Sequence, residues 1–313
     1  MKYYFAPMEG ITTHTFRQVH ARLFPGADRY YTPFFSPTSD QRFTPRELRE
    51  LLPEQNRGIT VVPQILSKCA PDIVWAAAGL REMGYEMFNF NLGCPSATVT
   101  AKGKGAGLLQ NPDALDALLA DVFSGSPIAV SLKSRIGFLT PDEFPRLLEI
   151  YRRYPAAELI LHPRTRKEMY LGDVHADAFT LAADGSPFPV VYNGNLFTVR
   201  DVRTFEAAHP DTEAVMIGRG AAMDPALFRK LHGGPGASRA ELRNFHEELY
   251  AAYREELGSL NAMRKMKELW HYLSACFEAG EDLAKKIART KDICKFEDYI
   301  SAAFREKKLI DEE

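Results

Sequence analysis

Along residues 1–235, short apolar runs alternate with amphipathic stretches. Eight of these runs predict strands, at 3–8, 29–35, 60–66, 87–92, 128–133, 158–162, 189–193 and 214–218. Most are short, continuous apolar runs and do not alternate strictly with polar residues. This pattern is typical of parallel strands that are buried on both faces.

Helical spacing follows the predicted strands. In residues 72–83, Ile73, Ala76 and Leu80 recur at intervals of three and four, and residues 112–123 repeat this spacing. Thr198 is placed to cap a helix that runs to about residue 208. Eight strand–helix units of this size predict an α/β fold of the TIM (β/α)8 type. A doubly wound open sheet shares the alternation, and the count of units does not exclude it.

The pattern changes after residue 235. The sequence GGPG at 233–236 is typical of a linker. No strand-like run follows, and the spacing predicts helices at 239–257, 261–277, 281–290 and 296–307. We therefore expect a catalytic TIM barrel at 1–235, followed by a small all-helical domain at 236–313.

Charge and cysteine content exclude several classes of protein. Lys and Arg number 39 against 41 Asp and Glu, a net charge of −2, which disfavours a generally basic nucleic-acid module but allows a local basic face. The chain has no apolar run of membrane-spanning length and no signal-peptide pattern, so we expect a cytoplasmic protein without a membrane partner. CxxC and HExxH motifs are absent, so no metal site is expected. Cys69, Cys276 and Cys294 are expected to be buried structural thiols.

Polar and glycine residues follow nearly every predicted strand, where a TIM barrel builds its active site. The residues at or near these strand ends are Pro7, Met8, Glu9, Gln64, Asn91, Cys94, Lys133, Arg135, His162, Arg164, Asn193, Gly194, Asn195, Gly218 and Arg219. NGN at 193–195 and GRG at 218–220 follow the last two strands, the usual place for a phosphate site. With Lys133 and His162 as donors to an electron-rich ring, they indicate flavin mononucleotide (FMN), although simple strand–helix turns would also explain the glycines.

Cys94 is the cysteine most suited to chemistry, because NLGCPS places it between Gly and Pro at the predicted rim. It could act as a nucleophile or as a general acid, and the residues alone leave this open. HPRTRKEMYLGD at 162–173 combines cations with Tyr170, which suits a polyanion or an RNA base.

Eight motifs, in this order, resemble those of the tRNA-dihydrouridine synthases. They are APMEG at 6–10, NLGCPS at 91–96, KGKGAGLL at 102–109, LKSRIG at 132–137, HPRTRKEMYLGD at 162–173, NGN at 193–195, IGRGA at 217–221 and MRKMKELWHYL at 263–273. The resemblance implies an FMN-bearing barrel with a helical domain that reduces uridines of the tRNA D-loop, using NADPH. Hydride from reduced FMN would reach carbon 6 of uracil, and Cys94 would protonate carbon 5.

The resemblance also implies roles for individual residues. FMN contacts fall on Pro7, Met8, Glu9, Gln64, Lys133, His162, Asn193, Gly194, Asn195, Gly218 and Arg219, and substrate contacts on Asn91, Arg164, Tyr170, Arg264 and Lys267. Asn195, Glu168 and Pro163 depart from the common family pattern, which weakens assignment to a subgroup.

The helical region offers cations for tRNA despite its balanced charge. Residues 285–295 carry five cations and one anion. Arg264, Lys267 and His271 are spaced to share one helix face, opposite an apolar face of Met263, Met266, Trp270 and Leu273. We expect a monomer that binds tRNA and NADPH. The alternatives are an FMN barrel acting on a small molecule of the dihydroorotate or enoate type, and a non-catalytic tRNA-binding protein.

Overall fold

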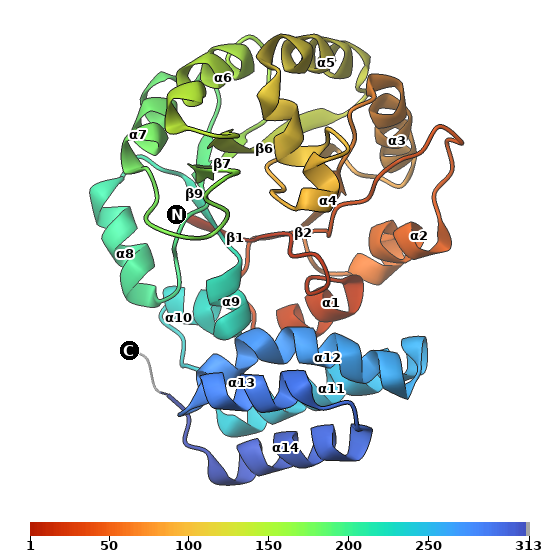
Figure 1. Ribbon diagram of the computed structural model, residues 1–313, viewed down its shortest axis with the longest axis vertical. Coiled ribbons are helices and arrows are strands. Elements are labelled where there is room, and N and C mark those ends of the chain that lie inside the picture. Colours follow the sequence, from red (N-terminus) through yellow and green to blue (C-terminus); the bar gives the residue numbers. More distant parts are fainter. Residues whose placement is uncertain (311–313) are drawn as a thin grey trace.

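The computed structural model describes residues 1–310, and its strands form one parallel sheet (Figure 1). The strands are β1 (Lys2–Phe5), β2 (Arg29–Tyr31), β3 (Val61–Val62), β4 (Gln64–Ile65), β5 (Met87–Leu92), β6 (Ala129–Gly137), β7 (Leu159–Thr165), β8 (Val190–Tyr192) and β9 (Ala214–Ile217). Their order is β3-β2-β1-β9-β8-β7-β6-β5-β4.

The strand expected at 60–66 is present in two pieces. Pro63 lies between β3 and β4 and has no N–H to donate to a neighbouring strand. Because β3 pairs with β2 and β4 pairs with β5, the two pieces together bring the ends of the sheet to one place. The predicted barrel is therefore confirmed, with nine strands in place of eight, and the open-sheet alternative is wrong.

Helices surround the barrel on its outer side (Figure 1). They are α1 (His14–Leu23), α2 (Pro45–Leu51), α3 (Ala70–Glu82), α4 (Ala97–Thr100), α5 (Pro112–Gly125), α6 (Phe144–Tyr151), α7 (Ala176–Gly185), α8 (Val199–Ala208), α9 (Arg219–Met223) and α10 (Leu227–Leu231). The apolar faces predicted for α3 and α5 are buried. Thr198 caps α8 as expected, since its side-chain oxygen accepts the N–H of Asp201 at 3.1 Å.

Two strands extend further than their apolar runs predict. β6 continues through Ser134, Arg135 and Ile136, and β7 continues through Arg164 and Thr165. All five residues are buried, and the register between the two strands shifts between Arg135 and Gly137. These extensions carry polar side chains from the sheet into the rim of the barrel.

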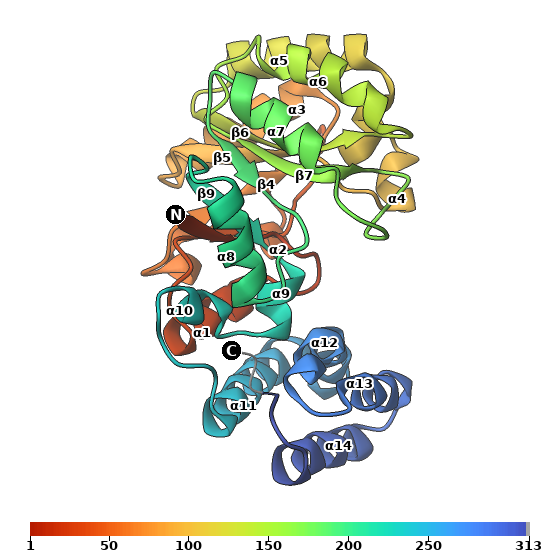
Figure 2. The same cartoon turned by 90° about the vertical axis from the view of Figure 1, so that its left-hand side faces the viewer.

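The four helices expected after residue 238 are confirmed. They are α11 (Arg239–Leu257), α12 (Ser259–Leu273), α13 (Gly280–Arg289) and α14 (Ile293–Glu306), and they form a layer below the barrel in Figures 1 and 2. The apolar face predicted on α12 is buried, with Trp270 at its centre. The proposed boundary near residue 235 falls between α10 and α11, and the division into two domains stays a prediction.

The helical layer packs directly on the loop after β1. Gly10 has φ +78°, and a Cβ there would lie 2.6 Å from Oε2 of Glu268 on α12. Nearby, the hydroxyls of Thr13 and Tyr253 lie 2.8 Å apart and join α1 to α11. α12 is thus held against the rim of the barrel.

The cysteines outside the rim differ from expectation. Cys69 and Cys276 are half-buried, and Cys294 is exposed. Phe296, Ile300 and Phe304 make up much of the buried face of α14, so Cys294, two residues before Phe296, points away from it. The expectation that Cys294 is buried is therefore wrong. In residues 1–310 no helix is long and apolar enough to cross a bilayer.

Candidate active site

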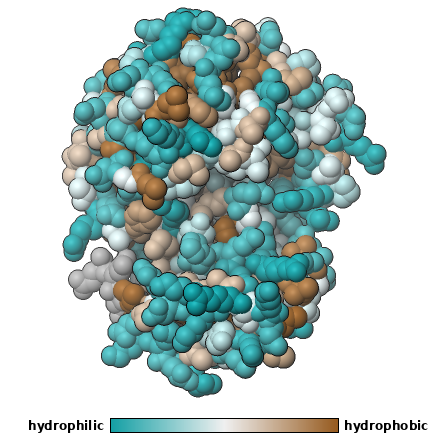
Figure 3. Space-filling view, viewed as in Figure 1, coloured by the Kyte–Doolittle hydropathy of each residue, from teal (hydrophilic) through white to brown (hydrophobic). Residues whose placement is uncertain are grey.

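A cavity of about 510 Å³ opens at the carboxyl ends of the strands, in the recess between barrel and helical layer that Figure 3 shows. Its walls come from many separate strands and from α12. Most of the residues predicted from the sequence line it: Pro7, Met8, Glu9, Gln64, Asn91, Cys94, Lys133, His162, Tyr170, Asn193, Gly194, Gly218 and Arg219. The barrel therefore brings these residues, which lie far apart in the chain, to one place.

A relay of side-chain amides positions the loop that carries Cys94. Asn91 accepts the N–H groups of Gly93 at 3.1 Å and Cys94 at 2.9 Å through its Oδ1. Its Nδ2 donates to Oε1 of Gln64 at 2.8 Å, and Gln64 in turn donates to Asn89 at 2.7 Å. The structure shows that the amide of Asn91 orients Cys94, and the expected contact of Asn91 with substrate stays a prediction.

The surroundings of Cys94 favour the protonated thiol. Burial raises the pKa of Cys94 above its ordinary value, although the charges of Arg135 and Lys133 act in the opposite direction. A thiol with a raised pKa keeps its proton at neutral pH, which suits a general acid and not a thiolate nucleophile. Of the two roles left open by the sequence, the electrostatics support the acid.

Lys133 and His162 line the same cavity, and both have lowered pKa values. Burial, with a contribution from the charge of Arg135, lowers the pKa of Lys133 to about 7. Its Nζ donates to Oδ1 of Asn193 at 2.7 Å. Burial also lowers the pKa of His162 well below its ordinary value, so its imidazole is neutral. The cavity thus combines one lysine ammonium near its titration point with an uncharged donor ring.

The two glycine segments after β8 and β9 pack closely against each other. A Cβ on Gly220 would lie 2.3 Å from the carbonyl oxygen of Leu196, so no side chain fits there. Asn195 does not line the cavity, and its Oδ1 accepts bonds from Arg164 at 3.1 Å and Arg219 at 3.2 Å. Asn195 therefore orients the arginine that does reach the cavity.

Arg164, which was expected to contact substrate, does not line the cavity. Its side chain is fully buried, and it donates to His162 Nε2 at 3.2 Å, to Leu171 O at 3.2 Å and to Gly172 O. No part of this side chain is exposed in the structure, and the expected contact with substrate stays a prediction. Through these hydrogen bonds Arg164 holds His162 and the loop after β7 in position.

Arg135, which the sequence places at the rim beside Lys133 without a role, is a residue of the site. It lines the cavity, and its guanidinium donates to Gly93 O at 2.9 Å and to Met169 O at 2.7 Å. It thereby joins the Cys94 loop to the loop that carries Tyr170. LKSRIG contains this arginine two residues after Lys133, and that spacing along a strand was the available signal.

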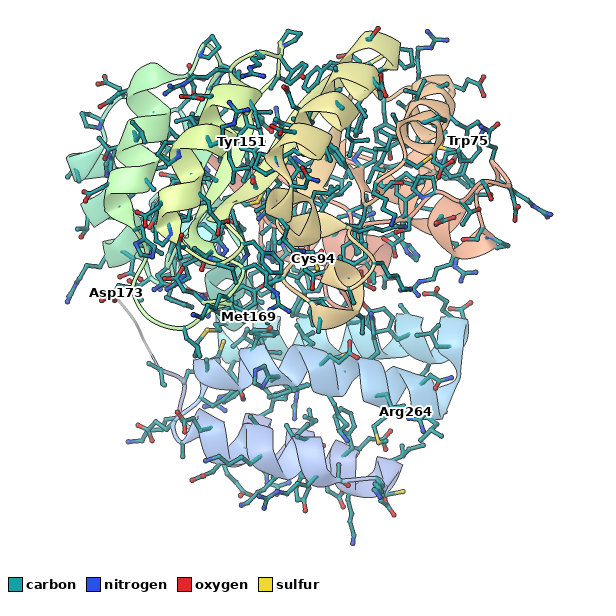
Figure 4. The ribbon with its side chains drawn as sticks, turned by 45° about the horizontal axis from the view of Figure 1, so that its top comes forward. Trp75, Cys94, Tyr151, Met169, Asp173 and Arg264 are labelled. Atoms are coloured by element: carbon teal, nitrogen blue, oxygen red, sulfur yellow. The ribbon has the colours of Figure 1, made fainter. Side chains whose placement is uncertain are left out.

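α12 supplies a further wall of the cavity through His271 and Tyr272. Arg264 and Lys267, expected beside the substrate, lie on α12 outside the cavity, and Figure 4 shows Arg264 on the helical layer, apart from Cys94. Arg264 is exposed, whereas Nζ of Lys267 donates to the carbonyl oxygen of Thr290 at 2.8 Å.

The loop between α13 and α14 forms an open basic hollow close to Lys267. It measures about 670 Å³ and is lined by Lys286, Arg289, Thr290, Lys291, Asp292, Lys295 and Tyr299. The cation-rich segment predicted at 285–295 is thus gathered on one surface of the helical layer.

The sequence matches the family model described as "Dihydrouridine synthase (Dus)" over residues 4–308. Among curated relatives, "tRNA-dihydrouridine(16) synthase" of Pseudomonas putida is 27% identical and covers 92% of each chain. "Probable tRNA-dihydrouridine synthase" of Rhodobacter capsulatus is 30% identical, over 96% of this chain and 94% of that protein. "tRNA-dihydrouridine synthase B" of Pasteurella multocida is 29% identical, over 72% and 67%.

Solved structures share the barrel at low sequence identity. The structure titled "Crystal structure of TcOYE with pHBA" has a TM-score of 0.55 at 9% identity, covering 76% of this chain and 90% of that one. "Morphinone reductase" has a TM-score of 0.53 at 11% identity, covering 76% and 87%. They show the fold alone, whereas the family model extends over barrel and helical layer together. The chain therefore belongs to the dihydrouridine synthase family.

Proposed function

We propose that the protein reduces a uridine of the tRNA D-loop to 5,6-dihydrouridine, with FMN in the cavity and NADPH as electron donor. The observation that carries the proposal is that a half-buried Cys94, whose pKa is raised by burial, shares one cavity with Lys133, His162 and the glycine segments. The relative named for position 16 matches along 92% of the chain and makes that uridine the first to test. A tRNA substrate places the activity in the cytoplasm.

The residues of the cavity fit a flavin mononucleotide. A volume of about 510 Å³ lies within the range of roughly 300–1,000 Å³ usual for small-molecule sites. Lys133 and neutral His162 would bind the ring system, where a lysine ammonium stabilises negative charge. Asn193, Gly194 and Gly218, with Arg219, would hold the phosphate, since glycine lets an anion approach the backbone. When bound and reduced, FMN supplies the hydride that adds to carbon 6 of uracil.

Cys94 supplies the other half of the addition. Its S–H donates a proton to carbon 5, so one hydride and one proton together saturate the 5,6 double bond. The thiolate that remains takes up a proton from solvent before the next turnover. Asn91 and Arg135 keep the loop of Cys94 in one geometry throughout, through the bonds to Gly93 and Cys94.

Loss of dihydrouridine from tRNA is the test of this proposal. Mass spectrometry of tRNA from cells lacking the gene should show one uridine that has lost its reduction, and the purified protein should absorb as a flavoprotein. Reduction of dihydroorotate or an enoate, with tRNA left unchanged, would support the small-molecule alternative. A colourless protein that binds tRNA would support the non-catalytic one.

Arg264 is expected to contact a tRNA phosphate, because it is exposed on α12 one helical turn before Lys267, which bonds Thr290 of the basic hollow. Arg264→Ala should weaken tRNA binding and reduce the slope of log K against log salt by about one unit. Arg146→Ala is the matched control, since Arg146 is equally charged and exposed but lies on α6 of the outer barrel. Binding titrations from low to moderate salt measure both slopes, and an unchanged slope for Arg264→Ala contradicts the contact.

A further inference from the structure

The loop after β7 carries three consecutive exposed apolar residues at the mouth of the cavity. Met169, Tyr170 and Leu171, here called the 169–171 tip, are 37%, 49% and 78% exposed. Within residues 1–310, the other large hydrophobic side chains that are exposed occur singly. Figure 4 shows Met169 at the edge of the barrel that faces the helical layer.

The tip is fixed in place by buried arginines. Arg135 donates to the carbonyl of Met169, and Arg164 donates to those of Leu171 and Gly172. Met169 has φ +55°, a backbone conformation that a non-glycine residue adopts only when its surroundings enforce it. The tip is therefore a preformed projection that presents apolar side chains to solvent, and not a loop free to fold them inward.

Tyr170 anchors the tip to the site itself. Its ring lies 5.0 Å from the guanidinium of Arg219, 5.2 Å from that of Arg135 and 5.9 Å from the ring of His162. Tyr170 lines the cavity with Cys94, whereas Leu171 points past it into solvent. The tip therefore borders the mouth of the cavity through Tyr170.

The surroundings of the tip suit nucleic acid more than protein or lipid. Lys167 is exposed on the same loop, and Arg166 donates to the carbonyl oxygen of Pro95 at 3.2 Å, beside Cys94. The loop therefore borders the segment after Cys94, where Lys102 is also exposed. Glu168 is paired with His175 at 2.7 Å, which leaves Asp173 as the exposed acidic group of the loop.

We propose that Met169 and Leu171 form an apolar wedge that fills the gap in the base stack left when the target uridine enters the cavity. The inference rests on the proposed function and extends it to how the uridine is extracted. A base can react in this cavity only after leaving its stack, and apolar side chains inserted at the vacated step compensate for the lost stacking. The wedge acts on the nucleotides that flank the target and makes no contact with the reacting atoms.

The test uses Leu171→Ala, with Leu181→Ala on α7 as matched control because Leu181 is also exposed, at 45%. Holoenzyme reduced beforehand is mixed with excess unmodified tRNA, and dihydrouridine formed in a single turnover is measured by mass spectrometry. Leu171→Ala should slow this step about tenfold, the scale of one lost base-stacking contact. The flavin content of Leu171→Ala, its reduction by NADPH and its affinity for tRNA should stay within about twofold of the wild type. For Leu181→Ala, these properties and the single-turnover rate should all stay within the same limit.

The outcomes separate the two proposals. A wild-type holoenzyme that reduces no tRNA overturns the proposed function, and the wedge with it. A wild-type enzyme that is active and a Leu171→Ala variant with the same single-turnover rate overturn the wedge alone. A variant that loses affinity for tRNA but keeps its saturated rate shows that the tip only docks tRNA, which also overturns the wedge.

Discussion

Cys94→Ala should keep its flavin and lose tRNA reduction. A placed general acid contributes roughly 10²–10⁴ in rate, so single-turnover formation of dihydrouridine should fall by about that factor. Flavin content should not change, because the side chains proposed to bind the ring and phosphate are Lys133, His162 and Arg219. Rapid-quench analysis of tRNA, with the flavin spectrum recorded on the same sample, measures both properties.

The pH dependence of the same step checks the role of the thiol. The protonated form is the active acid, and burial raises the pKa of Cys94 above its ordinary value. The decline in rate that comes from the thiol should therefore lie above pH values near 8.5, where a free thiol is about half ionised, and it is distinct from a decline near pH 7, where the Lys133 ammonium loses its proton. A rate that instead falls as the pH is lowered below 8 would assign catalysis to the thiolate form of Cys94. Undiminished reduction by Cys94→Ala would remove Cys94 from the chemistry altogether.

Trp270→Ala should destabilise the protein more than most single substitutions. The side chain is fully buried, its ring centroid lies 5.8 Å from that of Phe277, and its Nε1 donates to Nδ1 of His246 at 3.1 Å. Burial lowers the pKa of His246 to about 4, so the neutral imidazole would lose its donor in an apolar site. We expect the free energy of unfolding to fall by about 3–5 kcal/mol, measured by urea denaturation.

Trp75 provides the matched control for this substitution. It is the other tryptophan of the chain, lies half-buried on α3 and packs on Phe43 with ring centroids 4.7 Å apart (Figure 4). Trp75→Ala should lower stability less, because part of its surface already faces water. Equal losses for the two variants would contradict a core centred on Trp270.

The barrel could be predicted because most buried positions of its strands are apolar and form short runs. The prediction failed where buried residues are polar. β6 and β7 were expected to end at 133 and 162, but Ser134, Arg135 and Thr165 continue them. Their polar groups are satisfied inside the protein, by a hydroxyl, a carbonyl and the carboxylate of Glu168 respectively. The apolar run at 60–66 also hides a break in the strand, for which Pro63, with no N–H, was the available signal.

Most of the cavity could be predicted for a related reason. Residues next to strand ends meet at one rim in any TIM barrel, so Cys94, Lys133 and Asn193 could be placed together from their positions alone. The direction in which each side chain points could not be predicted. Arg164 follows His162 by two residues, yet its guanidinium turns inward to carbonyls of its own loop. His271 and Tyr272 come from another region of the chain, and only the packing of α12 on the loop of Gly10 brings them to the site.

Because α12 packs on the barrel in this way, two separate parts of the chain contribute residues to a single cavity. Cys94 and Lys133 belong to barrel segments, whereas His271, Tyr272 and the nearby Arg264 belong to α12. Substitutions on α12 can therefore alter which nucleotide is presented without disturbing the proton donor. Under the proposed function, relatives with different target positions can diverge along one helix while they inherit the same reaction chemistry.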